Sequence, residues 1–333
     1  MEITSRKWDQ AQSHRALRAD APGDREGTGA CLHRARDSAT SSNFIQWSYF
    51  YDLGCQRGRS IFSNQDLIVI IDYGYPVYLQ GVYGVCLLIS HEFISISQIY
   101  ETFKGFLTGF YICAPDNAHL TLAIGINNSG SGVTREHGSQ WAQLINELNN
   151  WIQSPPSWAS KLIVWGSIDA EPAFGDPSST RAWVEGYDAM NAPNSLLLNF
   201  GSCDGCPYAG CPACTPSNGW TLEDIWYISW GAPPAYPMPE IYRSDGVNAD
   251  QWHRIALHGL QAHGVLIRFR GTLTQWNACE ENRRWDPEAC ILPNGVRTDN
   301  RPEVGYLQLY QALNQDTRTA QTMPWSSDIS WEK

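Results

Sequence analysis

Basic residues are scarce in this sequence, and lysine is the scarcest. Of the 333 residues only Lys7, Lys104, Lys161 and Lys333 are lysines, and charged residues of both signs make up 17%. The formal net charge is -11. Nucleic acids and anionic membranes are bound through clusters of lysine and arginine. The composition therefore argues against either of them as the main partner.

Long apolar segments are missing as well. No apolar run reaches the length of a transmembrane helix, and the opening residues 1–6 are polar, without the apolar core of a secretory signal peptide. Ten cysteines are present, however, and an even number favours disulfides and an oxidising compartment. We expect a secreted or cell-surface protein. This expectation agrees with the N-terminus only if the start is truncated, unusual or wrongly assigned.

Several well-known motifs of cofactor binding and catalysis are absent. The sequence has no Gly-x-Gly-x-x-Gly, no Walker A loop, no His-Glu-x-x-His and no Gly-x-Ser-x-Gly. We therefore predict no cofactor. His253, His258 and His263 follow one another at intervals of five, which turns successive side chains around a helix instead of aligning them. They are not predicted to form a site.

Aromatic residues, in contrast, are abundant. The sequence has 15 Trp and 15 Tyr, and 43% of its residues are hydrophobic. A chain of this length and composition can bury the core of one large barrel or of two ordinary domains. Flat aromatic faces also stack on sugar rings, so the composition is compatible with a carbohydrate partner.

The chain divides near residue 43. Residues 1–43 are polar and lack periodicity, which predicts a flexible tail, and residues 44–333 are expected to form a single domain. Ser97 is a candidate helix cap. Apolar runs predict strands at 66–72, 119–126, 161–171, 195–200, 224–230 and 265–269, and helical spacing predicts helices at 94–112, 138–152, from 177, 248–262 and 302–313.

This alternation predicts a parallel sheet with helices outside it. Six strands are clear, whereas a (β/α)8 barrel of the TIM type needs eight. We predict such a barrel with Cys-rich loops, and assign the two missing strands to weak segments near 85–89 and before the closing helix. An open doubly wound sheet is the alternative.

The most informative stretch is the strand 161–171, which ends in two acids. Residues 162–165 are apolar and Pro172 ends the strand, because proline has no N–H to donate. Asp169 and Glu171 then share one strand face, about 6.6 Å apart along the chain. Two like charges so close make one carboxyl hold its proton more tightly, as a general acid beside a carboxylate requires. The alternative is that both are solvated loop residues.

Polar and aromatic residues follow the other predicted strands too. In a barrel these strand ends surround one mouth, and acids combined with Trp, Tyr and Asn are typical of a glycosidase cleft. We therefore predict catalytic carboxylates at Glu171, Asp169, Asp72 and Glu240, sugar-stacking rings at Trp230, Trp276 and Tyr236, and further substrate contacts at Asn127, Asn199 and Gln275.

The strand end Ile168-Asp-Ala-Glu171, together with Asp72 at the end of the first strand, resembles the lysozyme-type barrels of glycoside hydrolase family 25. It also resembles related glycoside-hydrolase-like barrels of uncharacterised bacterial proteins and, more distantly, the chitinase clan. The resemblance implies that Glu171 is the proton donor, with Asp169 and Asp72 in support. The longer chitinase motif is missing, since Trp165-Gly-Ser stands where its acids would precede.

The cysteines suggest cross-links. Cys203, Cys206, Cys211 and Cys214 form two Cys-x-x-Cys pairs, for which we favour disulfides and keep tetrahedral zinc as the alternative. Cys279 and Cys290 flank a polar loop and are expected to form a bridge. Cys86 and Cys113 are left as a bridge or as core thiols, and Cys31 as a possible link from the tail to the body.

The sequence thus predicts a glycoside hydrolase that cleaves a polysaccharide, of cell-wall or N-acetylated type. The alternative is a non-catalytic barrel that binds glycans or serves in an envelope. The expected partner is a glycan, with no nucleic acid and no membrane span, and the expected state is a monomer.

Overall fold

Eight parallel strands form the main sheet of the structure, a computed structural model that describes residues 12–18, 42–61, 66–88, 90–154 and 156–331. Each strand pairs with its neighbour in parallel, which confirms the predicted α/β class. In spatial order they are β10 (Gly271–Thr274), β11 (Trp325–Trp331), β1 (Gln12–Arg18), β2 (Asp66–Asp72), β6 (His119–Asn127), β7 (Leu162–Asp169), β8 (Leu197–Asn199) and β9 (Ala235–Pro237).

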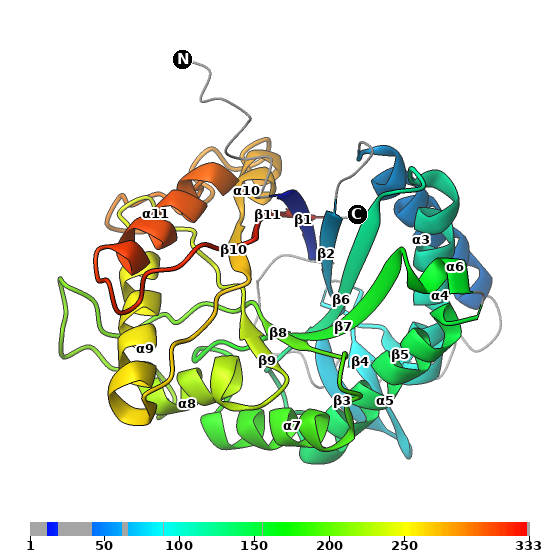
Figure 1. The fold of residues 1–333 in the computed structure, drawn as a ribbon, viewed down its shortest axis with the longest axis horizontal. Coiled ribbons are helices and arrows are strands. Elements are labelled where there is room, and N and C mark those ends of the chain that lie inside the picture. Colours follow the sequence, from blue (N-terminus) through cyan, green and yellow to red (C-terminus); the bar gives the residue numbers. More distant parts are fainter. Residues whose placement is uncertain (1–11, 19–41, 62–65, 89, 155, 332–333) are drawn as a thin grey trace.

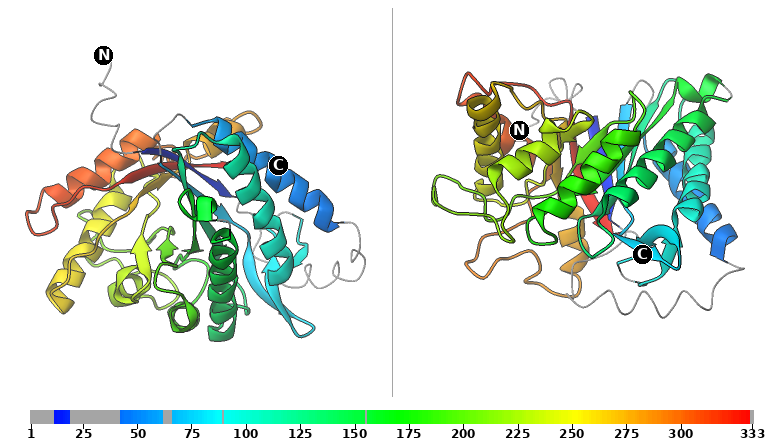
Figure 2. Two further views of the ribbon diagram at one scale, coloured as in Figure 1. Left: turned by 45° about the vertical axis from the view of Figure 1, so that its right-hand side comes forward. Right: turned by 90° about the horizontal axis from the view of Figure 1, so that it is seen from below.

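Helices surround these strands. Figure 1 shows the strands in the middle and the helices at the periphery, and Figure 2 shows the same arrangement from two other sides. The longer helices are α3 (Ser42–Arg59), α4 (Ile96–Cys113), α5 (Arg135–Ile152), α7 (Pro177–Met190), α9 (Val247–His263) and α11 (Pro302–Asn314). The shorter ones are α6 (Pro156–Ala159), α8 (Leu222–Trp226), the π-helix η1 (Tyr227–Gly231) and α10 (Trp276–Asn282). A small antiparallel sheet consists of β3 (Tyr75–Leu79), β4 (Val82–Cys86) and β5 (Phe93–Ser95).

The two faces of the main sheet bury separate cores. Along β2, Val69 and Ile71 belong to the core that packs against the helices, whereas Ile68 and Ile70 belong to a second core. Alternate residues of a strand point to opposite faces, so this division follows directly from the pleat. The second core joins side chains from both ends of the strand order: Leu198 on β8, Met238 after β9, Leu273 on β10 and Ile329 on β11.

Backbone hydrogen bonds connect β10 with the segment that continues β9. Arg270 N donates to Pro237 O at 2.8 Å and Leu273 N donates to Pro239 O at 2.9 Å. Ile241 N donates to Leu273 O at 2.8 Å, and Glu240 forms a parallel bridge with Leu273. The two outermost strands of the spatial order therefore contact each other.

Two of the six clear strands predicted are wrong, and the weak segment near 85–89 belongs in part to β4 of the antiparallel sheet instead of the main sheet. Residues 224–230 lie in α8, which begins with a capping box between Thr221 and Asp224, and in η1. Residues 265–269 join no ladder: the Gln321 side chain accepts from Phe269 N at 3.0 Å and donates to Ile267 O at 2.9 Å, and the strand itself starts only at Gly271.

The ends of the chain also differ from expectation. Gln12–Arg18 lie inside the predicted tail, yet they form β1 between β11 and β2. The rest of the tail up to residue 41, including Cys31, lies outside the described residues. β11 follows the closing helix and was not predicted, and Ser95 instead of Ser97 caps α4.

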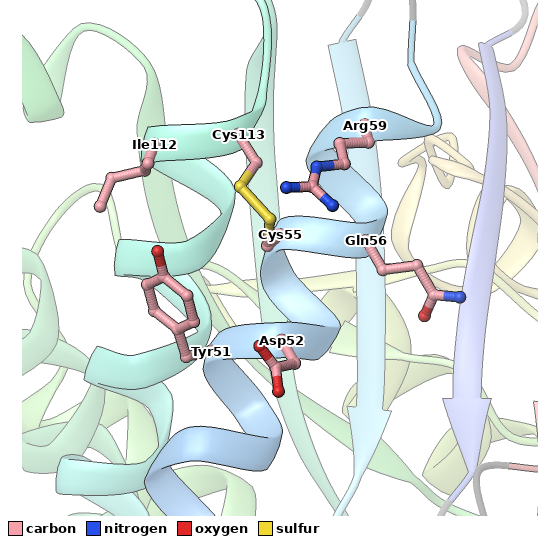
Figure 3. A pocket seen from close by; sticks show the side chains of 7 residues that line it. All are labelled: Tyr51, Asp52, Cys55, Gln56, Arg59, Ile112 and Cys113. Atoms are coloured by element: carbon pink, nitrogen blue, oxygen red, sulfur yellow. A yellow bond between two sulfur atoms is a disulfide. The ribbon is translucent and has the colours of Figure 1, made fainter.

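Helices α3 and α4 pack closely because glycines of each helix face the backbone of the other. A Cβ on Gly54 would lie 2.0 Å from Phe106 O, and one on Gly109 would lie 2.0 Å from Tyr51 O. Cys55 and Cys113 form a disulfide between the same two helices, which Figure 3 shows. Cys113 is therefore not the partner of Cys86, although Cys86 is disulfide-bonded as well.

Three further disulfides join Cys203 with Cys206, Cys211 with Cys214, and Cys279 with Cys290. The bridge predicted at 279 and 290 is confirmed. Zinc at the two Cys-x-x-Cys pairs is contradicted, since all four sulfurs are cross-linked. Disulfides persist in oxidising compartments, which supports an extracytoplasmic location. Among the described residues, no helix is both long and apolar enough to cross a membrane.

Candidate active site at the carboxyl ends of the strands

Three carboxylates meet where β7 and β9 end. Asp169 is the last residue of β7, Glu171 follows two residues later, and Glu240 lies three residues beyond β9. Each contributes an oxygen that lies within 4.8 Å of the other two. Asp169 and Glu240 are 1% exposed, whereas Glu171 is half-buried and open to solvent. We call these three residues the acid trio.

The strand pleat explains why the acids converge. Ile163 and Trp165 belong to the second core, and residues 167, 169 and 171 continue on the same face of the chain. After β9, Met238 belongs to that core. Glu240 follows two residues later, which places it on the same face of the chain. The acids of the trio thus extend the second core beyond its apolar part, at the carboxyl ends of two strands that β8 separates.

Asn128 fixes the backbone of Glu171. Its side-chain oxygen accepts from Glu171 N at 3.0 Å, and its amide nitrogen donates to Glu171 O at 3.2 Å. The same nitrogen also lies 3.0 Å from Thr180 Oγ1 on α7. Asn128 is 1% exposed, so it acts as a buried support for the acid. Asn128 was not predicted as a site residue, although it directly follows Asn127.

Residues that follow β8 also contact the side chain of Glu171. Ser202 N donates weakly to Glu171 Oε1 at 3.4 Å. Asp204 follows on the loop that Cys203 and Cys206 close. Desolvation at this loop and the negative charge of Glu171 raise the pKa of Asp204, and Arg243 partly opposes the rise. Asp204 is a fourth acid near the trio, and it could not be predicted because no strand pattern marks its loop.

The trio concentrates three carboxylates in a small volume. Carboxylates this close disfavour simultaneous ionisation, and burial of Asp169 and Glu240 increases that cost. A proton shared within the trio would relieve the repulsion. A divalent cation with oxygen ligands, such as Mg²⁺ or Ca²⁺, would relieve it as well. The geometry therefore fits acid–base chemistry or a cation, whereas the sequence predicted no metal.

Three other predicted site residues form hydrogen bonds with backbone groups near them. Asp72 accepts from Gly74 N at 3.1 Å. The acid cluster found among the described residues does not include Asp72. Asn127 accepts from Ser129 N and Oγ at 3.1 and 2.5 Å. Gln275 donates to Thr298 O at 2.8 Å. All three lie at the carboxyl ends of their strands, as predicted.

Asn199 is a structural residue. Its side-chain oxygen accepts from Ala170 N at 3.4 Å and Gly201 N at 3.2 Å, and its nitrogen donates to Ser229 Oγ at 2.8 Å. It is 0% exposed, so it cannot reach a ligand without a rearrangement. We expect it to hold the loop after β7 and not to bind substrate.

The predicted sugar-stacking rings lie on different elements: Trp276 on α10, Trp230 on η1 and Tyr236 on β9. Trp276 follows β10, and its ring lies 4.6 Å from the Arg301 guanidinium carbon and 5.6 Å from that of Arg283. Trp230 precedes β9 and meets Tyr236 edge-on at 5.1 Å between ring centroids. Tyr236 is four residues before Glu240, roughly 13 Å towards the amino end of the strand. Trp230 lies in η1, before β9, and does not follow a strand as expected, so sugar stacking by Trp230 and Tyr236 stays a prediction.

One pocket between α3 and α4 lies away from the trio. It has a volume of about 510 Å³ and is lined by Tyr51, Asp52, Cys55, Gln56, Arg59, Ile112 and Cys113. Figure 3 shows these side chains on α3 and α4, around the disulfide. No residue of the acid trio lines it, so this pocket is no part of the candidate site.

Comparisons with known proteins add no family assignment. A search of protein-family models found no match to the chain. A search of curated proteins found no match either. The assignment of function therefore depends on the geometry of the site.

Proposed function

We propose that the main sheet is a closed (β/α)8-type barrel and that its acid trio hydrolyses glycosidic bonds. Closure is supported by the hydrogen bonds between β10 and residues 237–241, and by the second core, which unites strands from both ends of the spatial order. A helix lies between most successive strands, as in a barrel. In such a fold the carboxyl ends of the strands carry the active site.

The observation that carries the proposal is the convergence of Asp169, Glu171 and Glu240 within 4.8 Å. Glycosidases act through a pair of carboxyl groups, about 5–5.5 Å apart in retaining enzymes and about 6.5–9.5 Å apart in inverting ones. An oxygen separation below 4.8 Å within the trio is closer to the retaining spacing than to the inverting one. It favours the retaining mechanism.

Glu171 is the general acid in this mechanism, because it is the member of the trio that solvent reaches. It gives its proton to the glycosidic oxygen as the bond from that oxygen to the anomeric carbon breaks. Glu240, which follows another strand, forms a bond to the anomeric carbon, and Asp169 stabilises the developing positive charge. Water then attacks the anomeric carbon, gives its proton to Glu171 and releases Glu240.

The substrate class is a polysaccharide, of cell-wall or N-acetylated type. An extracytoplasmic location, supported by the disulfides, gives access to such polymers. The acidic net charge of -11 fits a neutral or cationic glycan better than a polyanion. The protein is expected to act as a monomer.

A screen of the purified protein against peptidoglycan, chitin and plant polysaccharides tests the proposal. We expect release of reducing ends from at least one of them, and proton NMR of the first product should show the anomeric configuration of the substrate. Inversion would contradict the assignment of Glu240. Hydrolysis of none of these polymers, under conditions in which the protein is folded, would contradict the hydrolase.

The second candidate is a barrel that binds glycans without cleaving them. It is favoured by the burial of Asp169 and Glu240, which are only 1% exposed and lie beneath other side chains. Binding on a glycan array without release of reducing ends would support this candidate over the hydrolase.

A further inference from the structure

A second cluster of possible ligand side chains lies on the outer helices. Glu223 is on α8, and His258 and His263 are on α9. His258 Nε2 is 2.9 Å and His263 Nε2 is 2.8 Å from the same oxygen, Glu223 Oε2. The ligand atoms of all three side chains lie within 4.8 Å of one another. Two imidazoles and one carboxylate therefore converge on one point.

Packing against Trp226 holds the imidazole ring of His263 in place. Trp226 stacks on His263 with ring centroids 3.7 Å apart and an angle of 4° between the planes. Gly259 makes room for Trp226, since a Cβ there would lie 2.4 Å from Trp226 Nε1. Gly264 then ends α9 in the left-handed conformation, directly after His263. This packing orients the imidazole of His263 before any ligand is present.

We propose that Glu223, His258 and His263 bind a divalent transition-metal ion, with Zn²⁺ as the best match. Two histidines and one carboxylate form a common ligand set for zinc, and a water molecule completes the tetrahedron. Ligand atoms of such a site are about 3.3 Å apart for bonds of about 2.0–2.1 Å. The observed 2.8 and 2.9 Å are slightly shorter, so a small rotation of each side chain accommodates the ion.

The site is accessible and distinct from the acid trio. The side chains of His258, His263 and Glu223 are 26%, 32% and 41% exposed, so an ion can enter from solvent. Figure 1 shows α8 and α9 at the periphery, whereas the trio follows the central strands. Nitrogen ligands also select zinc over the hard cations that an all-oxygen site prefers. The ion would fasten α8 to α9.

Titration of the purified protein with ZnCl2 by calorimetry tests this inference. We expect the wild type to bind one equivalent more than the double variant His258→Gln/His263→Gln, and the affinity of this equivalent to fall at least about tenfold in Glu223→Gln. Saturating Zn²⁺ should raise the Tm of the wild type by at least about 2 °C more than the Tm of the double variant.

His119→Gln is the matched control. His119 forms a surface pair with Asp66 at 2.8 Å but, within the described part of the chain, belongs to no cluster of possible metal ligands, so this variant should bind Zn²⁺ like the wild type. The inference fails if the wild type takes up no Zn²⁺ at millimolar concentration. It also fails if the double variant, folded by circular dichroism, binds as many equivalents as the wild type. Neither result depends on hydrolysis.

Discussion

Replacing Glu171 with glutamine should lower kcat on a hydrolysed glycan by roughly 100- to 10,000-fold, the usual contribution of a general acid. Glutamine keeps the shape of the side chain and an oxygen that can accept from Ser202 N, as Glu171 Oε1 does at 3.4 Å. It has no proton to donate to the leaving oxygen. Reducing-end assays under saturating substrate measure the loss.

Glu147→Gln is the matched control for this experiment, because Glu147 is an exposed acid on α5. It should have wild-type kcat. Substrates with a leaving group that needs no protonation should be affected much less by Glu171→Gln, since the acid then has no role in bond cleavage. A Glu171→Gln protein with full activity on every hydrolysed glycan would remove Glu171 from the mechanism.

Lowering the pH from 7 to 4 should remove about 3 kcal/mol of stability through one histidine, His137. This residue is 0% exposed. Its Nε2 lies 2.9 Å from Gly84 O, and Trp183 Nε1 donates to its Nδ1 at 3.0 Å. One nitrogen donates and the other accepts, so the ring is neutral. Burial lowers the pKa of His137 from 6.5 to about 4, against the smaller effect of the Gly84 hydrogen bond.

Proton linkage determines whether stability rises or falls with pH. Between pH 4 and 6.5 the unfolded chain binds a proton at His137 that the folded chain does not, so stability rises with pH in this window. The contribution is complete above pH 6.5 and is lost as the pH falls towards 4. Urea unfolding at several pH values measures the loss. His137→Gln should reduce the pH dependence, and His119→Gln, at an exposed histidine, should leave the part due to His137 intact. An NMR titration of folded protein with a His137 midpoint near 6.5 would contradict this account.

The central strand and its acids could be predicted because their signal is local. Residues 162–165 form an apolar run, Pro172 ends it, and the two-residue period places Asp169 and Glu171 on one face. Glu240 was predicted from its place after an apolar segment, and it does join the trio. The segment itself was assigned wrongly. Short apolar runs do not distinguish a buried strand from a buried helix, which is why residues 224–230 were misassigned.

Features that depend on contacts between distant segments could not be predicted. Asn128 supports Glu171 across 43 positions of sequence, and nothing in its loop distinguishes it from Asn127. His258 and His263 do not align on an isolated helix. They meet only because Glu223, 35 positions before His258, reaches both of them at the end of α9. Helical spacing predicts which side chains of one helix share a face, but it gives no information about a partner on another helix.

A double-mutant cycle on Glu171 and Glu240 tests most directly whether the trio works as one catalytic unit. Groups that act together in one step are not additive, so Glu171→Gln/Glu240→Gln should lose about as much kcat/KM as the more damaging single variant. The measurement is kcat/KM for the wild type, both single variants and the double variant on the same glycan. Losses that multiply, or a single variant with wild-type kcat/KM, would contradict a shared catalytic site.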